Sequence, residues 1–169
     1  MMAHLASIAK TSPNELEAKM TQMSEEIRKG HREIEKLRGQ LMRGEIDQLM
    51  IGTREIGGLR LVTLTRDHIP ADRLREMGDE MKARTENMVA VLASTEENKV
   101  TFCVSCGKEA VQKGIFAGDL IKHLCRITGG GGGGRKDSAM GGGRDPIKVD
   151  DAIATVDEYI LTHVKKEEV

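Results

Sequence analysis

Apolar residues between positions 13 and 50 recur at alternating spacings of four and three, which is a heptad pattern. This spacing predicts one long helix with a single apolar stripe along its length. A capping-box sequence, Ser12-Pro13-Asn14-Glu15, precedes the pattern and predicts the helix start, with Ser12 as N-cap and its hydroxyl accepting from the Glu15 amide. Residues 1–11 carry no such pattern, and we expect a disordered N-terminus there. The stripe consists of Leu16, Met20, Met23, Ile27, Ile34, Leu37 and Leu41.

A single helix cannot bury its own stripe, so the stripe needs a second copy of the chain, another helix or the downstream domain. We interpret residues 12–51 as an oligomerisation helix and expect a homodimer. Glycine costs about 1 kcal/mol inside a helix, and Gly30 and Gly44 fall at core positions of the heptad. An ideal two-stranded zipper is therefore disfavoured. Ile46 leaves the register, so the packing is expected to change near Gly44.

The pattern after the long helix is typical of a mixed domain over residues 52–169. Strand-like runs alternate with stretches of helical period, and their order is β-α-β-β-α, then a glycine-rich loop at 129–143, then a last helix. The fold class is therefore α/β (α+β), a small sheet of three to four strands with packed helices. The predicted strands are 58–65, 87–93 and 100–105, and the predicted helices begin at Pro70 and cover 115–127 and 149–164.

Composition narrows the functional classes. Aromatic residues make up 2% of the chain, which argues against a protein that stacks bases on several aromatic platforms. The net charge is −1, so there is no overall basic surface. No apolar run approaches the roughly 20 residues of a membrane span, and no membrane partner is expected. Three cysteines are typical of reduced thiols, and we expect a cytoplasmic protein, with an organelle as the alternative.

The cysteines and histidines of this chain, which in other proteins bind metals or act in catalysis, form no recognisable metal-binding or catalytic motif. Cys103 and Cys106 form a CxxC pair on a predicted strand, where their odd separation places them on opposite faces. No second pair supplies the remaining zinc ligands. The five histidines are scattered, and His123 is interpreted as a surface or helix-edge residue. We predict no catalytic residue, no metal and no cofactor for this chain.

The glycine-rich segment reads GGGGGGRKDSAMGGG. A flexible linker is the simplest interpretation of glycine runs, but a patterned charged insert between two runs fits it poorly. A Walker loop is disfavoured, because Arg135 stands where the pattern needs Gly and Asp137 where it needs Ser or Thr. Bare glycine amides can still form an anion-binding nest, to which Arg135 and Lys136 add charge.

Charge along the chain supports an anionic partner. Residues 99–144 hold eight Lys or Arg and three acids, a local charge of +5, whereas residues 145–169 sum to −4. A basic patch can bind a phosphate backbone even in a chain of near-zero net charge. The alternative is a merely solvated charged surface. The candidate nucleic-acid-binding residues are Lys113, Lys122, Gly129, Gly130, Gly131, Gly132, Gly133, Gly134, Arg135, Lys136 and Arg144.

These motifs resemble the C-terminal domain of alanyl-tRNA synthetases. The family's run reads GGGGGG-Arg-Pro-Asp-Met-Ala-Gln-Ala-Gly-Gly, and the departures of the present chain from it include Lys136, Met140 and Gly141. The resemblance covers roughly residues 12–164, and the glycine segment is its most specific part. The matching positions are Gly129 to Gly134, Arg135, Asp137, Ala139, Gly142 and Gly143, with Lys113-Gly114, Ala117-Gly118 and Leu120-Ile121-Lys122 upstream.

The resemblance implies a non-catalytic domain that binds the elbow of alanine-specific tRNA, where the D and T loops meet. It also implies a role in holding tRNA between the charging and editing sites of the parent enzyme, and support for dimerisation. That parent would use ATP and Mg, with Zn in its editing domain. Two alternatives remain open. One is a purely structural oligomerisation module. The other is a domain attached to DHH-type phosphoesterases that binds single-stranded nucleic acid.

Overall fold

The computed structural model describes residues 2–165, with side chains from His4 onward, and divides into two compact units, Met1–Glu45 and Ile46–Val169. The long helix α2, Leu16–Ile51, begins in the first unit and ends in the second. Helix α1, Met2–Ile8, and a short 3₁₀ turn, Pro13–Glu15, precede it. None of the helices that the structure describes is long and apolar enough to cross a bilayer.

The N-terminal unit corrects the expectation of a disordered segment over residues 1–11. Helix α1 forms there, and Ala6 and Ala9 pack against Leu16 in a small buried cluster. Leu16 is 8% exposed, so α1 covers the position that the heptad pattern assigned to oligomerisation. The predicted cap also differs. The Ser12 hydroxyl makes no bond to a backbone amide and instead donates to the Glu15 carboxylate, at 2.8 Å.

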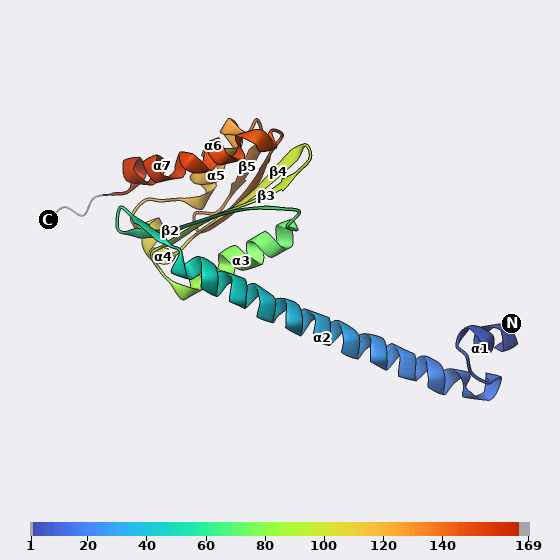
Figure 1. Cartoon of the computed structure of the whole chain (residues 1–169). Helices are drawn as coiled ribbons and strands as arrows, with labels where there is room; N and C mark the ends of the chain where they lie inside the picture. The colour runs from blue at the N-terminus through green and yellow to red at the C-terminus, as the bar shows by residue number, and fades with distance from the viewer. Residues whose placement is uncertain (1, 166–169) are drawn as a thin grey trace. The chain divides into compact units, whose positions relative to one another are not determined.

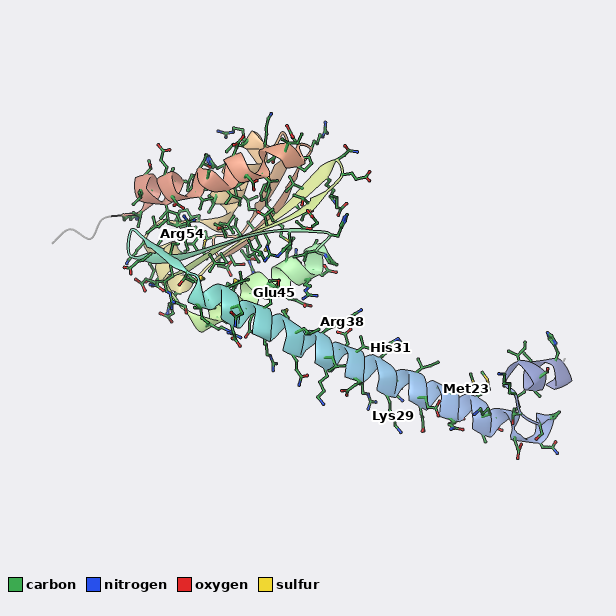
Figure 2. All side chains as sticks on the ribbon, in the orientation of Figure 1. Met23, Lys29, His31, Arg38, Glu45 and Arg54 are labelled. Carbon is green, nitrogen blue, oxygen red and sulfur yellow. The ribbon has the colours of Figure 1, made fainter. Side chains whose placement is uncertain are left out.

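The rest of the predicted stripe lies on the surface of α2. Its six remaining side chains are 39% to 71% exposed. Figure 2 shows side chains along this part of α2, with Met23 and Lys29 among those labelled. No described part of the N-terminal unit covers these side chains. Oligomerisation through the stripe therefore stays a prediction. The exposed stripe residues are Met20, Met23, Ile27, Ile34, Leu37 and Leu41.

The globular unit is built on one sheet with the strand order β1-β2-β3-β4-β6-β5 (Figure 1). Only β2 and β3 pair in parallel, and the other neighbours are antiparallel. The strands are Arg54–Ile56 (β1), Leu59–Asp67 (β2), Met88–Glu96 (β3), Lys99–Cys106 (β4), Gly131–Gly134 (β5) and Ser138–Gly143 (β6). The helices are Ala71–Arg84 (α3), Lys108–Gln112 (α4), Ala117–Ile127 (α5), Val149–Ala154 (α6) and Val156–His163 (α7), with a 3₁₀ turn at Pro146–Lys148.

The predicted α+β class and the long N-terminal helix are confirmed, whereas the sheet has six strands in place of three to four. The strands β2, β3 and β4 lie where the sequence pattern predicts them. The strand β1 has three residues, too few to show a pattern. The strands β5 and β6 are glycine-rich and lack the β-branched and aromatic residues that identify a strand.

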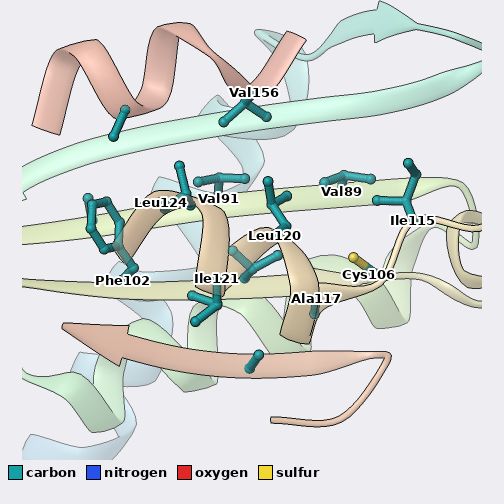
Figure 3. Packing of buried hydrophobic residues seen from close by; sticks show 14 of the residues in the cluster. Val89, Val91, Phe102, Cys106, Ile115, Ala117, Leu120, Ile121, Leu124 and Val156 are labelled. Carbon is teal, nitrogen blue, oxygen red and sulfur yellow. The ribbon is translucent and has the colours of Figure 1, made fainter. Parts of the chain in front are cut away.

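Helices cover both faces of the sheet. On one face α5, α6 and α7 close the main core, in which Phe102 packs with Leu120, Leu124 and Val156 (Figure 3). On the other face α3 packs on β3 and β4 through Leu74, Met77 and Met81. The strand β4 therefore lies in the middle of a layered structure, and the strands added after it extend the sheet sideways.

The last turns of α2 belong to the globular unit. Ile46 is fully buried, which agrees with the predicted change of packing near Gly44. Asp47 forms an ion pair with Arg84 of α3, and the Arg60 guanidinium donates to the Met50 carbonyl at 3.4 Å. These contacts fix the end of the helix on the sheet.

Candidate nucleic-acid interface

The glycine-rich segment is a β-hairpin and not a loop. The strand β6 pairs with β4 from Val100↔Gly143 to Ser105↔Ser138, and β5 pairs with β6 at the outer edge of the sheet. The two glycine runs, which were expected to form a loop with an anion-binding nest, therefore form an extended ladder. This corrects the predicted loop at 129–143. No pattern of side chains in the sequence predicts this hairpin, because it is determined by the elements that pack against it.

Helix α5 packs so closely on one face of the hairpin that this face has no room for side chains. A Cβ atom at Gly132 would lie 2.7 Å from Ile121 Cγ2, and one at Gly141 would lie 2.8 Å from the same atom. Real Cβ atoms essentially never make contacts this short. At Gly143 a Cβ would meet the Thr128 side chain in the same way. Glycine at these positions therefore allows the helix and the hairpin to touch.

Gly129 and Gly130 serve the end of α5. Gly129 adopts φ +69°, in the left-handed region that favours glycine. The Gly130 amide donates to the Cys125 carbonyl at 2.7 Å, and the Gly129 amide donates to the Arg126 carbonyl at 3.5 Å. This is the Schellman pattern, which satisfies the last carbonyls of a helix. The structure thus gives these two predicted binding residues a capping role.

The opposite face of the hairpin is open. No heavy atom lies within 4 Å of the Cβ positions of Gly131 and Gly133. Their cross-strand partners are Gly142 and Met140, which share that face because paired residues point to the same side. We call Gly131, Gly133, Met140 and Gly142 the open glycine face. Its surface is almost entirely backbone, so a flat or bulky anion can approach the chain closely.

Three basic residues border this hairpin. Arg75, on α3, places its guanidinium 3.3 Å from Met140 Sδ. Arg135, in the turn between β5 and β6, has 80% of its side chain exposed and lies 3.3 Å from the Asp137 carboxylate. The Lys136 ammonium lies 4.9 Å from the centre of the Phe116 ring. Sequence reasoning missed Arg75, because it precedes Met140 by 65 residues and nothing in its own helix marks it.

The turn that carries Arg135 and Lys136 is held firmly. The amide of Ala117 donates to the Lys136 carbonyl at 2.8 Å, and the amide of Gly118 donates to the Arg135 carbonyl at 3.2 Å. The first turn of α5 thereby uses amides that would otherwise lack partners. The basic side chains of the turn are therefore presented from a fixed backbone.

Asp137 closes the turn from the other side. Lys82 lies between two carboxylates, with Nζ 2.9 Å from both Asp79 and Asp137. The hydrogen bond from Lys82 lowers the pKa of Asp137, which keeps that carboxylate ionised. The charge of Lys82 is offset by these two partners. The exposed cations at this hairpin are Arg75, Lys136 and Arg135, and Arg135 shares Asp137 with Lys82.

The structure separates the other predicted binding residues. Arg144 follows β6, at the end of the hairpin away from the turn. Lys113 forms an ion pair with Glu109 at 2.8 Å, and its Nζ lies near the Gly58 turn between β1 and β2, at the opposite edge of the sheet. Lys122 lines a pocket between α5 and α7. Arg135 and Lys136 are thus the predicted cations that share the hairpin turn.

The cysteines lie as the spacing predicts, on opposite faces of β4. Cys106 belongs to the core on the α5 side, whereas Cys103 lies beneath Gly78 of α3. Burial raises the pKa of Cys103 to about 11 and that of Cys106 to about 12. Neither thiol is a nucleophile at neutral pH. The expectations of no metal, no cofactor and no catalytic residue remain predictions.

Comparison with known proteins agrees with this architecture. The model of the DHHA1 domain family matches residues 58–162. The alanine–tRNA ligase of Natranaerobius thermophilus is 35% identical over 92% of this chain, and that of Shouchella clausii is 39% identical over 82%. The chain spans 18% and 16% of the length of these two relatives.

Solved structures agree as well. The C-Ala domain of Aquifex aeolicus alanyl-tRNA synthetase is 29% identical, with a TM-score of 0.62 over 64% of this chain and 97% of that domain. RecJ of Thermus thermophilus has a TM-score of 0.57 over 97% of this chain and 24% of its own at 15% identity, which shows a shared fold alone. The chain therefore belongs to the DHHA1 domain family, and its predicted resemblance to the C-terminal domain of alanyl-tRNA synthetases is confirmed.

Proposed function

We propose that this chain is a non-catalytic, tRNA-binding domain of an alanyl-tRNA synthetase that acts in the cytoplasm. It contacts the outer corner of alanine-specific tRNA and helps to position that tRNA between the charging and editing sites. The observation that carries the proposal is the open glycine face, bordered by Arg75 and by the turn that holds Arg135 and Lys136.

The chemistry of this surface suits a folded RNA backbone. Phosphates need donors and positive charge at close range, and bare glycine backbone leaves nothing to hold them away. Folded RNA is recognised largely by shape and backbone contacts, whereas splayed single strands are bound by stacking on aromatic rings. The three basic residues at the hairpin and the low aromatic content favour the first mode. The likeness to the Aquifex aeolicus domain supports the same choice.

Two other functions make different predictions. A structural module would associate through α2 and bind no RNA. A domain of the phosphoesterase type would prefer single strands. The coding sequence upstream separates our proposal from the phosphoesterase type, because a class II synthetase core supports the former and DHH-type aspartate motifs support the latter.

The ligand requirement tests the proposal directly. Fluorescence anisotropy of labelled alanine tRNA, followed at several salt concentrations, is expected to show binding that weakens as salt rises. A tRNA with an altered acceptor stem should bind as well as the natural one. A tRNA whose D and T loops cannot pair, and a single-stranded oligonucleotide of equal length, should bind at least about tenfold more weakly. Equal affinity for the single strand would favour the phosphoesterase interpretation, and no binding at low salt would favour the structural one.

We also propose that the exposed stripe of α2 supports a homodimer. Sedimentation of the wild-type chain should show a mass that rises with concentration, and Ile34→Asp should give a monomer because it places a charge in the apolar row. Lys29→Asp, which lies outside the stripe, is the matched control and should still associate. A wild-type chain that stays monomeric at every concentration would remove the dimer proposal.

A further inference from the structure

Residues of α5 and α7, with Thr155 before α7, line an open pocket of about 550 Å³ on the far side of α5 from the hairpin. Ile121 and Cys125 of α5 contact the glycine strands, whereas Lys122, His123 and Arg126 line this pocket. The pocket is thus a second concave surface, distinct from the open glycine face. Its volume suits a small organic ligand.

Three ring side chains form a row in this pocket. The rings of Tyr159 and His163 stack with centres 4.0 Å apart and planes 16° apart. The centre of the His123 ring lies 5.0 Å from that of Tyr159, with the two planes tilted by 44°. Tyr159 is the one tyrosine of a chain that has no tryptophan, and two of the five histidines lie beside it. Rows of this kind provide flat apolar surface for stacking.

The hydrogen bonds of the two imidazoles fix their orientations. The Thr155 hydroxyl donates to the Ala152 carbonyl at 2.7 Å, so it accepts from His123 Nε2 at 2.9 Å. His163 Nδ1 donates to the Tyr159 carbonyl at 2.8 Å. Burial, with Arg126 next in effect, lowers the pKa of His123, and burial raises the pKa of Tyr159. His123 and Tyr159 are therefore both neutral at pH 7, and their rings are preorganised.

The two basic residues beside these rings differ in whether a carboxylate offsets their charge. Lys122 lies 3.6 Å from the Asp119 carboxylate, which offsets its charge. Arg126 forms no ion pair with any carboxylate among residues 2–165. A guanidinium beside an aromatic row can bind a phosphate through paired N–H donors. The nearby carboxylate of Asp119 can accept hydrogen bonds from sugar hydroxyls.

We propose that this pocket binds a nucleoside monophosphate unit, with the base stacked along the Tyr159–His163 row and the phosphate held by Arg126. The unit is either a free mononucleotide or an unpaired nucleotide of RNA. The combination of a flat ring surface and one available cation distinguishes this ligand class from inorganic phosphate. The site does not depend on the hairpin, so it stands apart from the proposed tRNA contact.

Tyr159 provides its own reporter. In protein labelled with ¹³C-tyrosine, the ring signals belong to one residue. Titration with AMP should shift these signals in a saturable way, whereas ribose 5-phosphate and inorganic phosphate should move them far less. Arg126→Gln should raise the Kd for AMP about tenfold, the loss expected for one charge-assisted hydrogen bond. Lys108→Gln, on α4, is the control and should leave the Kd unchanged.

The source of the nucleotide follows from competition. Displacement of bound AMP by tRNA would assign the pocket to an unpaired nucleotide of RNA, and simultaneous binding would assign it to a free mononucleotide. Tyrosine signals that stay fixed at millimolar AMP would overturn the proposal, as would a Kd that Arg126→Gln leaves unchanged. Because AMP binding is measured without tRNA, this result and a failure of the proposed tRNA contact at the hairpin can be told apart.

Discussion

Replacing Gly132 by alanine is expected to lower the free energy of unfolding of the globular unit by about 2–3 kcal/mol. The added Cβ would clash with Gly141 Cα across the hairpin, and it would lie 2.7 Å from Ile121 Cγ2 and 2.8 Å from the Met140 carbonyl oxygen. Two of these neighbours are hairpin backbone and the third is a buried helix residue, so none can move without disturbing the hairpin or the packing of α5 on it. Urea unfolding followed by circular dichroism measures the destabilisation, which corresponds to roughly 10 °C in Tm.

Gly133→Ala is the matched control, because it places the same methyl group one residue further along the same strand. No heavy atom lies within 4 Å of that Cβ position. Its effect on stability should stay within about 0.5 kcal/mol. If Gly132→Ala and Gly133→Ala were equally stable, the close packing of α5 on the hairpin would not be what requires glycine there.

Removing the two basic side chains of the hairpin turn, in Arg135→Ala with Lys136→Ala, is expected to weaken tRNA binding by about tenfold for each side chain that binds a phosphate. The slope of log affinity against log salt should fall by about 0.7–0.9 for each such phosphate. The Arg135 side chain is 80% exposed. The carbonyls of both residues, which hold the turn, are untouched by the substitution. The urea midpoint should therefore change little, and anisotropy at several salt concentrations measures the binding.

Arg66→Ala tests whether this effect belongs to the hairpin or to charge in general. Arg66 is exposed on β2, towards the opposite edge of the sheet, and its guanidinium donates to the neighbouring Thr65 carbonyl. Like Arg135→Ala, this variant removes one guanidinium, but it does so near the other edge of the sheet. Equal decreases in affinity for the two single variants would mean that tRNA responds to the total charge and that the hairpin turn is not its site.

The sequence predicts well those helices and strands whose apolar residues recur with a helical or strand period, because that period shows which side is buried. Helix α3 buries Leu74, Met77 and Met81, and their helical spacing already shows an apolar side. The strands β2 to β4 and helix α5 follow in the same way. The heptad pattern likewise predicts α2, yet it misplaces Leu16, since the cover for that residue comes from the small side chains Ala6 and Ala9.

The glycine hairpin has no hydrophobic pattern of its own. Glycine is depleted in strands, so a run of six suggests a loop. The backbone at Gly132 and Gly141 is extended because β6 pairs with β4 and β5, and the close approach of Ile121 excludes side chains there; both are facts about tertiary structure. The charge count points to this region, but it groups Lys113 and Lys122 with Arg135, and the fold places them elsewhere. The separate contribution of Arg75 is likewise visible only once α3 lies beside β6.

A strand made of four glycines has a cost that the folded contacts alone do not show. Glycine loses more backbone freedom on ordering than any other residue, about 0.5–1 kcal/mol relative to alanine. The hairpin therefore owes its order to the pairing of β6 with β4, to helix α5 and to the Lys82–Asp137 pair, and its intrinsic stability is low. Segments of low intrinsic stability are the ones that unfold locally in a native protein. Any ligand that binds the open glycine face also reduces this fraying, so part of its binding free energy is coupled to the order of the strand itself.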